Sequence, residues 1–235
     1  MQARHPRWAK GGLLVLLRHG QSSLNEAGRF SGWSDCPLTE EGVRQAHEAG
    51  RELRDAGIVF DACFTSVLSR AVETASIVLG ELGLAEIPVT RTWRLNERHY
   101  GALEGLLKRE VAAQYGAAQV EAWRNGADAT PPPLSGDDPR HPRHSEIYRD
   151  VAPELLPAAE SLRDAFARVI HTYKEEIRPL VESGRRILVV SHGNPIRALV
   201  AHLDGLPPGE IPLIEIRNAK PIVFFEMTKT PTEHK

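Results

Sequence analysis

Short apolar runs alternate with longer amphipathic stretches along the chain. Each apolar run ends at a turn or a polar residue, which is typical of a buried strand. Runs of this kind cover residues 13–17, 61–65, 87–89, 186–190 and 221–227. The stretches between them repeat apolar side chains with helical spacing and predict helices over about 40–55, 68–82, 108–115, 160–181 and 195–203. Strands that alternate with helices predict an α/β fold, here a three-layer α/β/α sandwich around a mostly parallel central sheet.

Residues at two helix ends agree with this pattern. Thr39 is placed to cap the N-terminus of the first long helix, and Glu40 and Glu41 fall in its first turn, where the helix dipole favours acidic side chains. Pro195 lies in the first turn of the last predicted helix, a position that needs no backbone N–H.

The segment from about 93 to 150 interrupts the alternation. Its density of Pro, Gly, Asp and Arg predicts little regular structure apart from the helical piece at 108–115. Loops of this length inside a compact domain are usually functional. We therefore expect a flexible N-terminal extension at 1–11 and a single domain over 12–235, with an insertion at about 93–150.

Composition excludes several classes of protein. The chain has 235 residues, 29 Lys and Arg against 31 Asp and Glu, and a net charge of −2, which gives no support for nucleic acid or a membrane as the main partner. Its two cysteines, Cys36 and Cys63, form neither a disulfide framework nor a CxxC zinc motif. No apolar run has the length of a membrane span or of a signal-peptide core. We expect a cytoplasmic protein without a metal.

Two His-Gly pairs follow predicted strands. Arg18-His19-Gly20 comes after the strand at 13–17, and Ser191-His192-Gly193 comes after the strand at 186–190. Ligands of open α/β sheets bind beyond the carboxyl ends of the strands, so neighbouring strands would bring both imidazoles to one pocket. The helix that starts after His192 favours an anion there.

This combination suits phosphoryl transfer through a histidine. A neutral imidazole is a usable nucleophile near neutral pH, and arginines stabilise the charge on phosphoryl oxygens. Each residue also has a structural alternative. A lone histidine at a strand end is more often a hydrogen-bonded structural residue, and Arg70 in SVLSRAVETA is equally well a solvated arginine. Glu97 fits a surface salt-bridge cluster, and the charges at Lys108 and Arg124 fit a solvated face.

Five motifs resemble one known family. In chain order they are LVLLRHGQSSLN, RFSGW, DACFTSVLSRAVETA, RLNERHYGALEG and VVSHGNPIRALV. In order and spacing these motifs, from about residue 13 to 226, are similar to the cofactor-dependent phosphoglycerate mutases of the histidine phosphatase superfamily. The resemblance implies the fold of that family and the interconversion of 3-phosphoglycerate and 2-phosphoglycerate in glycolysis and gluconeogenesis.

The resemblance also implies roles for individual residues. His19 would be the nucleophile, Arg18, Arg70 and His192 would surround the phosphoryl group, and Glu97 would be the general acid and base. The implied substrate-binding residues are Gly20, Gln21, Ser22, Ser23, Leu24, Asn25, Ser31, Gly32, Arg98, His99, Tyr100, Lys108, Arg124, Asn125, Gly193 and Asn194. The implied primer is 2,3-bisphosphoglycerate, with no metal. The implied partners are small phosphorylated three-carbon acids and further copies of the chain, in a homodimer or homotetramer.

The sequence departs from the family at three places. Gln21 stands where the family commonly has Glu, Asn125 replaces the second of two adjacent arginines, and only residues 228–235 follow the last predicted strand. A missing guanidinium weakens the binding of an anion, and a short tail leaves a phosphoenzyme less protected from water. Two alternatives therefore stay open: a histidine phosphatase acting on small phosphomonoesters, and a weakened, ligand-sensing relative.

Overall fold

A computed structural model of the chain describes residues 2–4, 12–207 and 210–225, and within them six strands form one sheet in the order β1-β6-β2-β5-β3-β4. The strands are β1 (Gln2–Arg4), β2 (Leu13–Arg18), β3 (Ala62–Thr65), β4 (Val89–Arg91), β5 (Arg186–Ser191) and β6 (Ile222–Phe225). The β2–β6 pairing is antiparallel and the other pairings are parallel. The predicted mostly parallel sheet is confirmed.

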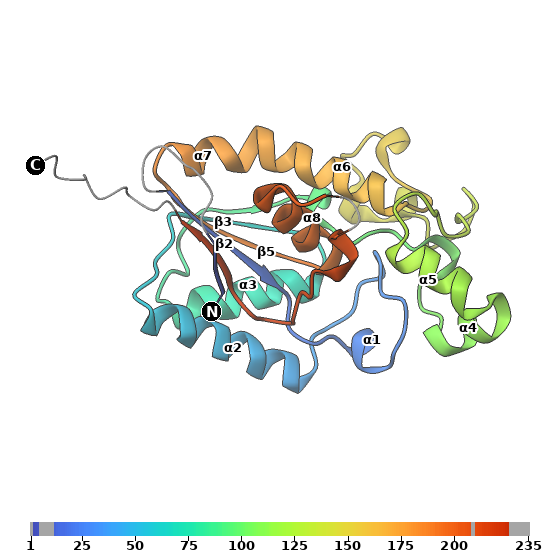
Figure 1. Cartoon of the computed structure of the whole chain (residues 1–235), viewed down its shortest axis with the longest axis horizontal. Helices are drawn as coiled ribbons and strands as arrows, with labels where there is room; N and C mark the ends of the chain where they lie inside the picture. The colour runs from blue at the N-terminus through green and yellow to red at the C-terminus, as the bar shows by residue number, and fades with distance from the viewer. Residues whose placement is uncertain (1, 5–11, 208–209, 226–235) are drawn as a thin grey trace, which may run out of the picture.

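Helices cover both faces of this sheet. Figure 1 shows α2 and α3 on one face and α6, α7 and α8 on the other, which confirms the predicted three-layer sandwich. Helices α4 and α5 lie at one end of the molecule, beyond the sheet. The bounds are α1 (Ser23–Glu26), α2 (Glu40–Asp55), α3 (Ser69–Glu81), α4 (Lys108–Tyr115), α5 (Ala117–Asn125), α6 (Leu162–Thr172), α7 (Arg178–Glu182) and α8 (Gly193–Asp204).

Residues 13–17 of strand β2 are apolar because both faces of the strand are buried. Leu14 and Leu16 pack in the core beneath α6 and α8, whereas Val15 and Leu17 pack in the core shared with α2 and α3. All four side chains are fully buried, and each contributes about 1.5–3 kcal/mol by leaving water. The central strands are thereby fixed, and their carboxyl ends with them.

The predicted helix at 195–203 begins two residues earlier, at Gly193 of α8, and two other predicted elements are displaced or divided in the structure. The expected strand at 87–89 lies two residues further on, at β4, because Pro88 has no N–H to donate and β4 is an exposed edge strand without apolar alternation. The expected helix at 160–181 is divided into α6, a π-helical turn (Tyr173–Ile177) and α7. Pro179 lies in the first turn of α7, where its missing N–H disrupts a continuous helix.

The segment at 93–150 has more regular structure than expected. Besides α4 it contains α5, which the prediction of a largely irregular segment missed. Val120 and Trp123 of α5 are one helical turn apart and pack with Phe30, Leu103 and Val111, so tertiary contacts stabilise this short helix.

The N-terminal segment also differs from expectation. Residues 2–4 of the predicted flexible extension form β1, which pairs with β6, so the expectation is corrected for these residues. The rest of that extension, and the short tail at 228–235, lie outside the described residues. Thr39 caps α2 as predicted, since its side chain accepts a hydrogen bond of 3.0 Å from the N–H of Gly42.

Candidate active site

The two His-Gly pairs meet at one edge of the sheet. Strands β2 and β5 are neighbours, with Arg18 opposite Ser191. The N–H of His19 continues this pairing and donates to the carbonyl oxygen of Ser191 at 2.9 Å. The imidazoles of His19 and His192 consequently pack edge to face, with ring centroids 5.0 Å apart and an interplanar angle of 62°.

The imidazole of His19 is held in one tautomer. Its Nδ1 atom lies 2.6 Å from the carbonyl oxygen of Gly20, which only accepts hydrogen bonds. Nδ1 therefore carries the proton, and the Nε2 lone pair stays available for attack. Burial, then the charges of Arg70 and Arg18, hold the pKa of His19 well below its usual range, so the ring is neutral at pH 7.

The imidazole of His192 packs against that of His19 but is not part of the cavity wall. Its Nε2 atom lies 2.8 Å from the hydroxyl of Ser66, and its buried Nδ1 atom has no hydrogen-bond partner among the described residues. Burial, followed by the charge of Arg70, holds the pKa of His192 well below its usual range. His192 is therefore a neutral ring packed on the nucleophile.

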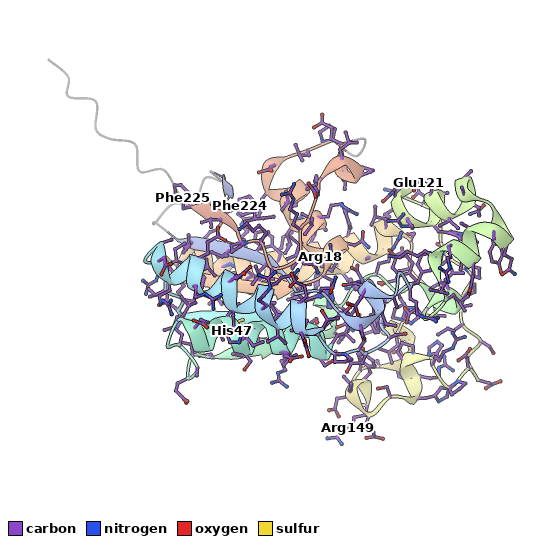
Figure 2. All side chains as sticks on the ribbon, turned by 90° about the horizontal axis from the view of Figure 1, so that it is seen from below. Arg18, His47, Glu121, Arg149, Phe224 and Phe225 are labelled. Atoms are coloured by element: carbon purple, nitrogen blue, oxygen red, sulfur yellow. The ribbon has the colours of Figure 1, made fainter. Side chains whose placement is uncertain are left out.

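Two arginines direct unused donors towards this region. Arg70, in the first turn of α3, is fully buried and donates to the carbonyl oxygens of Gly32 (2.7 Å) and Ser34 (2.9 Å). Arg18, near the middle of the molecule in Figure 2, donates to the carbonyl oxygen of Ile216 at 2.8 Å. Among the described residues, neither Nε–H has a partner. Buried N–H groups are almost always paired, so both fit an anion that hydrogen-bonds there.

The carboxylate of Glu97 is held at the N-terminus of α8. Its Oε1 atom accepts hydrogen bonds from the N–H of Arg98 (2.8 Å) and from the Asn194 side chain (2.9 Å). A Cβ atom on Gly193 would lie 3.5 Å from Glu97 Oε2 and 3.9 Å from Arg18 Cζ, so Oε2 and the Arg18 guanidinium face the same small volume.

These groups share one cavity with residues from distant parts of the chain. It is lined by Arg18, His19, Asn25, Arg29, Phe30, Ser31, Gly32, Arg70, Glu97, Tyr100, Lys108, Arg124, Asn125, Gly193, Asn194 and Arg197. Six of these side chains are cationic and one is a carboxylate. Burial, followed by the charges of Arg124 and Arg18, lowers the pKa of Lys108. An excess of positive charge around a neutral histidine nucleophile suits a multiply charged phosphate ester.

Comparison with known proteins agrees with this chemistry. The family model of the histidine phosphatase superfamily (branch 1) matches residues 14–229. The chain belongs to this superfamily. It is 49% identical, over 94% of its length and 90% of the relative's, to the 2,3-bisphosphoglycerate-dependent phosphoglycerate mutase of Nitratidesulfovibrio vulgaris. It is 46% identical, over 94% of its length and 92% of the relative's, to the enzyme of the same name from Nitrosococcus oceani. The resemblance inferred from the motifs is confirmed.

A similar solved structure is named as a phosphatase rather than as a mutase. The mycobacterial glucosyl-3-phosphoglycerate phosphatase aligns with a TM-score of 0.66 and 28% identity, covering 90% of each chain. The histidine phosphatase fold therefore accompanies both a mutase and a phosphatase among the relatives of this chain.

Most of the residues expected at the site line the cavity, but eight do not. These are Gly20, Gln21, Ser22, Ser23, Leu24, Arg98, His99 and His192. Ser22 caps α1, which contains Ser23 and Leu24. The side chain of Gln21 accepts from the Thr39 hydroxyl at 2.9 Å.

The other expected residues outside the cavity wall make protein contacts, although Arg98 Nε and Nη1 and His99 Nε2 have no hydrogen-bond partner among the described residues. The N–H of Gly20 donates to the hydroxyl of Thr74 at 3.1 Å, so it is not free for a ligand. Arg98 is fully buried beside Tyr100 and donates to the carbonyl oxygen of Arg124 at 3.0 Å. His99 accepts from the N–H of Gly101 at 2.9 Å, and burial lowers its pKa to about 3. Of these residues, Arg98 contacts the cavity wall through the ring of Tyr100.

Three cavity residues were missed in the sequence: Arg29, Phe30 and Arg197. Arg197 was detectable, because it lies three residues after Asn194 and one helical turn separates side chains on the same face. Its Nη1 atom donates to Asn194 Oδ1 at 2.9 Å, and its Nε atom donates to the carbonyl oxygen of Ile214 at 3.2 Å. Arg29 and Phe30 lie in a loop, where no periodicity marks them.

Across residues 2–4, 12–207 and 210–225, no group of three or more His, Cys, Asp or Glu side chains is placed to hold a metal ion. No helix of the described part is long and apolar enough to cross a membrane.

Proposed function

We propose that the chain is a 2,3-bisphosphoglycerate-dependent phosphoglycerate mutase, which interconverts 3-phosphoglycerate and 2-phosphoglycerate. The proposal of phosphoryl transfer depends on one observation: His19 is neutral, with Nε2 unprotonated, and lies in a cavity lined by six cationic side chains. The names of the two relatives at 49% and 46% identity support a mutase within the superfamily. The substrates are accordingly small phosphorylated three-carbon acids.

The residues fit the bisphosphorylated primer that this function implies. The unpartnered Nε–H groups of Arg18 and Arg70 suit the oxygens of one phosphate, close to His19. Lys108 and Arg124 are cations on the wall of the same cavity and suit a second anionic group. When bound, the primer supplies the phosphoryl group that the enzyme carries before its first turnover.

His19 is the nucleophile in this proposal. Its Nε2 lone pair forms a bond to phosphorus as the bond to the ester oxygen breaks, and the protonated Nδ1 keeps its hydrogen bond to Gly20. Arg18 and Arg70 balance the charge on the phosphoryl oxygens during transfer. The reverse transfer moves the phosphoryl group from His19 to a substrate hydroxyl.

Glu97 is the general acid and base. Its Oε2 atom lies on the side of Arg18, while Oε1 is occupied by Asn194 and the N–H of Arg98. Oε2 gives a proton to the leaving oxygen and takes one from the attacking hydroxyl, so the proton balance closes over one turnover.

The far end of the substrate is bound by residues of the insertion and of α8. Lys108 and Arg124 bind its second charged group, with Tyr100, Asn125 and Arg197 on the same wall. Only one arginine, Arg124, stands where the family usually has two, so one charge-assisted contact of about 1.5–3 kcal/mol is missing.

A second candidate function uses the same residues. With water in place of the acceptor hydroxyl, His19 and Glu97 would hydrolyse small phosphomonoesters. The likeness to a glucosyl-3-phosphoglycerate phosphatase favours this candidate. The two functions differ only in whether the acceptor is a sugar-acid hydroxyl or water.

One experiment separates them. We expect purified protein to form 2-phosphoglycerate from 3-phosphoglycerate faster when 2,3-bisphosphoglycerate is added, with little release of inorganic phosphate. Release of phosphate with negligible isomerisation would identify the phosphatase. No turnover, together with no labelling of His19 by a labelled primer, would identify a ligand-sensing relative. His19→Asn is the control that should abolish labelling and turnover.

Several further points stay predictions: a homodimer or homotetramer, a cytoplasmic location, a single domain over 12–235 and catalysis without a metal. Native mass spectrometry of the purified chain, with an assay in a chelator, tests the first and the last. An activity lost in chelator and restored by a divalent cation would contradict the metal-free mechanism.

A further inference from the structure

One guanidinium holds the segment that carries Glu97. Three carbonyl oxygens of residues 94–97 accept hydrogen bonds from a side chain, the guanidinium of Arg168 in α6. Its Nη1 atom donates to the carbonyl oxygens of Arg94 (2.8 Å) and Asn96 (2.9 Å), and its Nη2 atom donates to that of Glu97 (2.8 Å). Three carbonyls within four residues therefore converge on one side chain.

The remaining donors of Arg168 are held by a second buried residue. Its Nε atom donates to Glu160 Oε1 at 2.6 Å, and Nη2 also donates to Oε2 at 2.8 Å. The five N–H groups of the guanidinium thus make five hydrogen bonds. The two side chains are only 10% and 5% exposed, so the pair is screened little by solvent.

Glu160 completes the contact with the same segment. Its Oε2 atom accepts from the N–H of His99 at 2.8 Å, and its own N–H donates to the carbonyl oxygen of His99 at 2.9 Å. Arg168 and Glu160 together therefore fix residues 94–99 from one side.

Arg168 is itself carried by a rigid element, and Glu160 directly precedes the N-cap residue of that element. Helix α6 starts at a capping box made by Ser161 and Asp164, and its residues Ala165 and Val169 are fully buried in the core. A side chain presented by a capped, buried helix is located more accurately than one presented by a loop.

Glu97 is consequently fixed at both ends. Its carbonyl oxygen accepts from Arg168 and from Trp33 Nε1 at 2.6 Å, whereas its carboxylate accepts from Asn194. The Arg168 guanidinium also lies over the Trp33 ring, 5.6 Å from its centroid. The Oε2 atom is thus positioned from two sides: Asn194 holds the carboxylate at the cavity wall, and Arg168 holds the backbone of Glu97 from outside the cavity.

We propose that Arg168, held by Glu160, is the positioning residue for the general acid and base Glu97. The inference rests on the proposed function, because it assumes that Glu97 transfers protons. Arg168 itself does not line the cavity. Arg168 must therefore act by fixing the position of the Glu97 carboxylate. A displacement of a catalytic group by about 1 Å lowers the rate roughly 100-fold.

The test begins with Arg168→Lys, which keeps the charge but cannot donate in five directions. We expect kcat to fall between about 10-fold and about 100-fold, with KM for phosphoglycerate within about twofold of the wild type, since the cations of the cavity are unchanged. Glu160→Gln keeps the shape of its side chain and should lower kcat in the same direction. The matched control is Arg186→Lys, whose partner Asp61 lies at the opposite end of β5. It should leave kcat unchanged.

A double variant separates positioning from general stability. In Glu97→Gln the proton donor is gone, so adding Arg168→Lys should change the residual kcat by less than about twofold. If Arg168→Lys lowers kcat by the same factor in the Glu97→Gln background as in the wild type, the proposal is overturned and Arg168 is a structural residue only. All variants are assayed below the temperature at which circular dichroism shows them unfolding. If Arg168→Lys does not fold, Glu160→Gln takes its place: adding it to Glu97→Gln should also change the residual kcat by less than about twofold.

The failure of this proposal is distinguishable from that of the proposed function. A wild-type protein that releases phosphate instead of isomerising its substrate overturns the mutase but still uses Glu97, so the same cycle is then measured on phosphate release. A wild-type protein without turnover overturns both. An active wild type with multiplying losses overturns the positioning role alone.

Discussion

The Nδ1 atom of His19 lies 2.6 Å from the carbonyl oxygen of Gly20. The backbone thus determines which nitrogen of the nucleophile is protonated, without a carboxylate partner on the ring. This arrangement depends on a close approach of two backbone segments, because a Cβ atom on Gly20 would lie 2.2 Å from the carbonyl oxygen of Gly42. Glycine at position 20 therefore serves the geometry of His19 rather than direct contact with a ligand.

The tautomer of His19 can be observed directly. In ¹⁵N NMR spectra of protein with labelled histidine, we expect His19 as the Nδ1-protonated neutral ring at neutral pH, with no titration near pH 6.5, because burial holds its pKa well below the usual range. The spectrum of His19→Asn assigns the signal. A ring protonated on Nε2 at neutral pH, or one that titrates near pH 6.5, would contradict the inferred nucleophile.

Substitution of Gly20 tests the close approach of the two segments. We expect Gly20→Ala to lower kcat at least about 10-fold and the free energy of unfolding by about 1–3 kcal/mol, since the backbone carbonyl of Gly42 has little room to move. Gly80→Ala is the matched control. Gly80 is exposed in α3 with nothing near its Cβ position, so the change should stabilise the protein by up to about 1 kcal/mol. Equal effects in both variants would refute the steric argument.

The pairing of His19 with His192 could be predicted from the sequence because it depends on strands. Each histidine follows a run that is apolar on both faces, and such runs mark central strands whose carboxyl ends share one edge of the sheet. The residues that surround this pair were harder to predict. Helix α5 was missed because its stability comes from the packing of Val120 and Trp123 rather than from a long periodic pattern.

The role of Arg168 could not be predicted from the sequence at all. Its acceptors at residues 94–97 are backbone carbonyls, which every residue has, so no side-chain motif marks the contact. Arg197 differs in this respect. It follows Asn194 by one helical turn on a predicted helix, and projecting that helix would have placed it at the site.

Acid stability should depend on His99. Burial lowers its pKa to about 3, so below pH 6.5 the unfolded chain binds a proton that the folded chain does not. Its contribution to stability is complete above pH 6.5 and is lost as the pH falls. We expect the wild type to lose about 1 kcal/mol more than His99→Asn between pH 6.5 and pH 5.5, measured as free energies of unfolding in urea.

Glu104, whose Oε1 atom lies 3.3 Å from His99 Nδ1, changes stability with pH in the opposite direction. Burial raises the pKa of its carboxyl to about 7, so the folded chain keeps a proton that the unfolded chain loses above pH 4.5. Stability from this group is complete below pH 4.5 and is lost as the pH rises to 7. Glu104→Gln should therefore make the loss of stability on acidification steeper. If His99→Asn has the same pH dependence as the wild type, the assignment to His99 is wrong.

A second arginine beside Arg124 should tighten substrate binding. Asn125 lines the cavity, and its side chain donates to Glu121 on the same helix at 2.5 Å. Figure 2 shows Glu121 on α5, away from Arg18 at the centre. We expect Asn125→Arg to lower KM for phosphoglycerate by roughly tenfold, since one charge-assisted hydrogen bond is gained. Asn125→Gln should leave KM unchanged, and a raised KM in Asn125→Arg would count against the missing contact.

Arg197 should partly replace that missing arginine. It lines the cavity, and its Nη2 atom has no hydrogen bond within the described residues, whereas Nε and Nη1 are used by Ile214 and Asn194. We expect Arg197→Met to raise KM for phosphoglycerate about 10-fold to about 100-fold, because one guanidinium–anion contact is lost. Measured KM and kcat distinguish this from an indirect effect: a fall in kcat with KM unchanged would mean that Arg197 acts only through Asn194 on Glu97. If the contact is direct, Asn125→Arg should restore part of the lost affinity in the double variant.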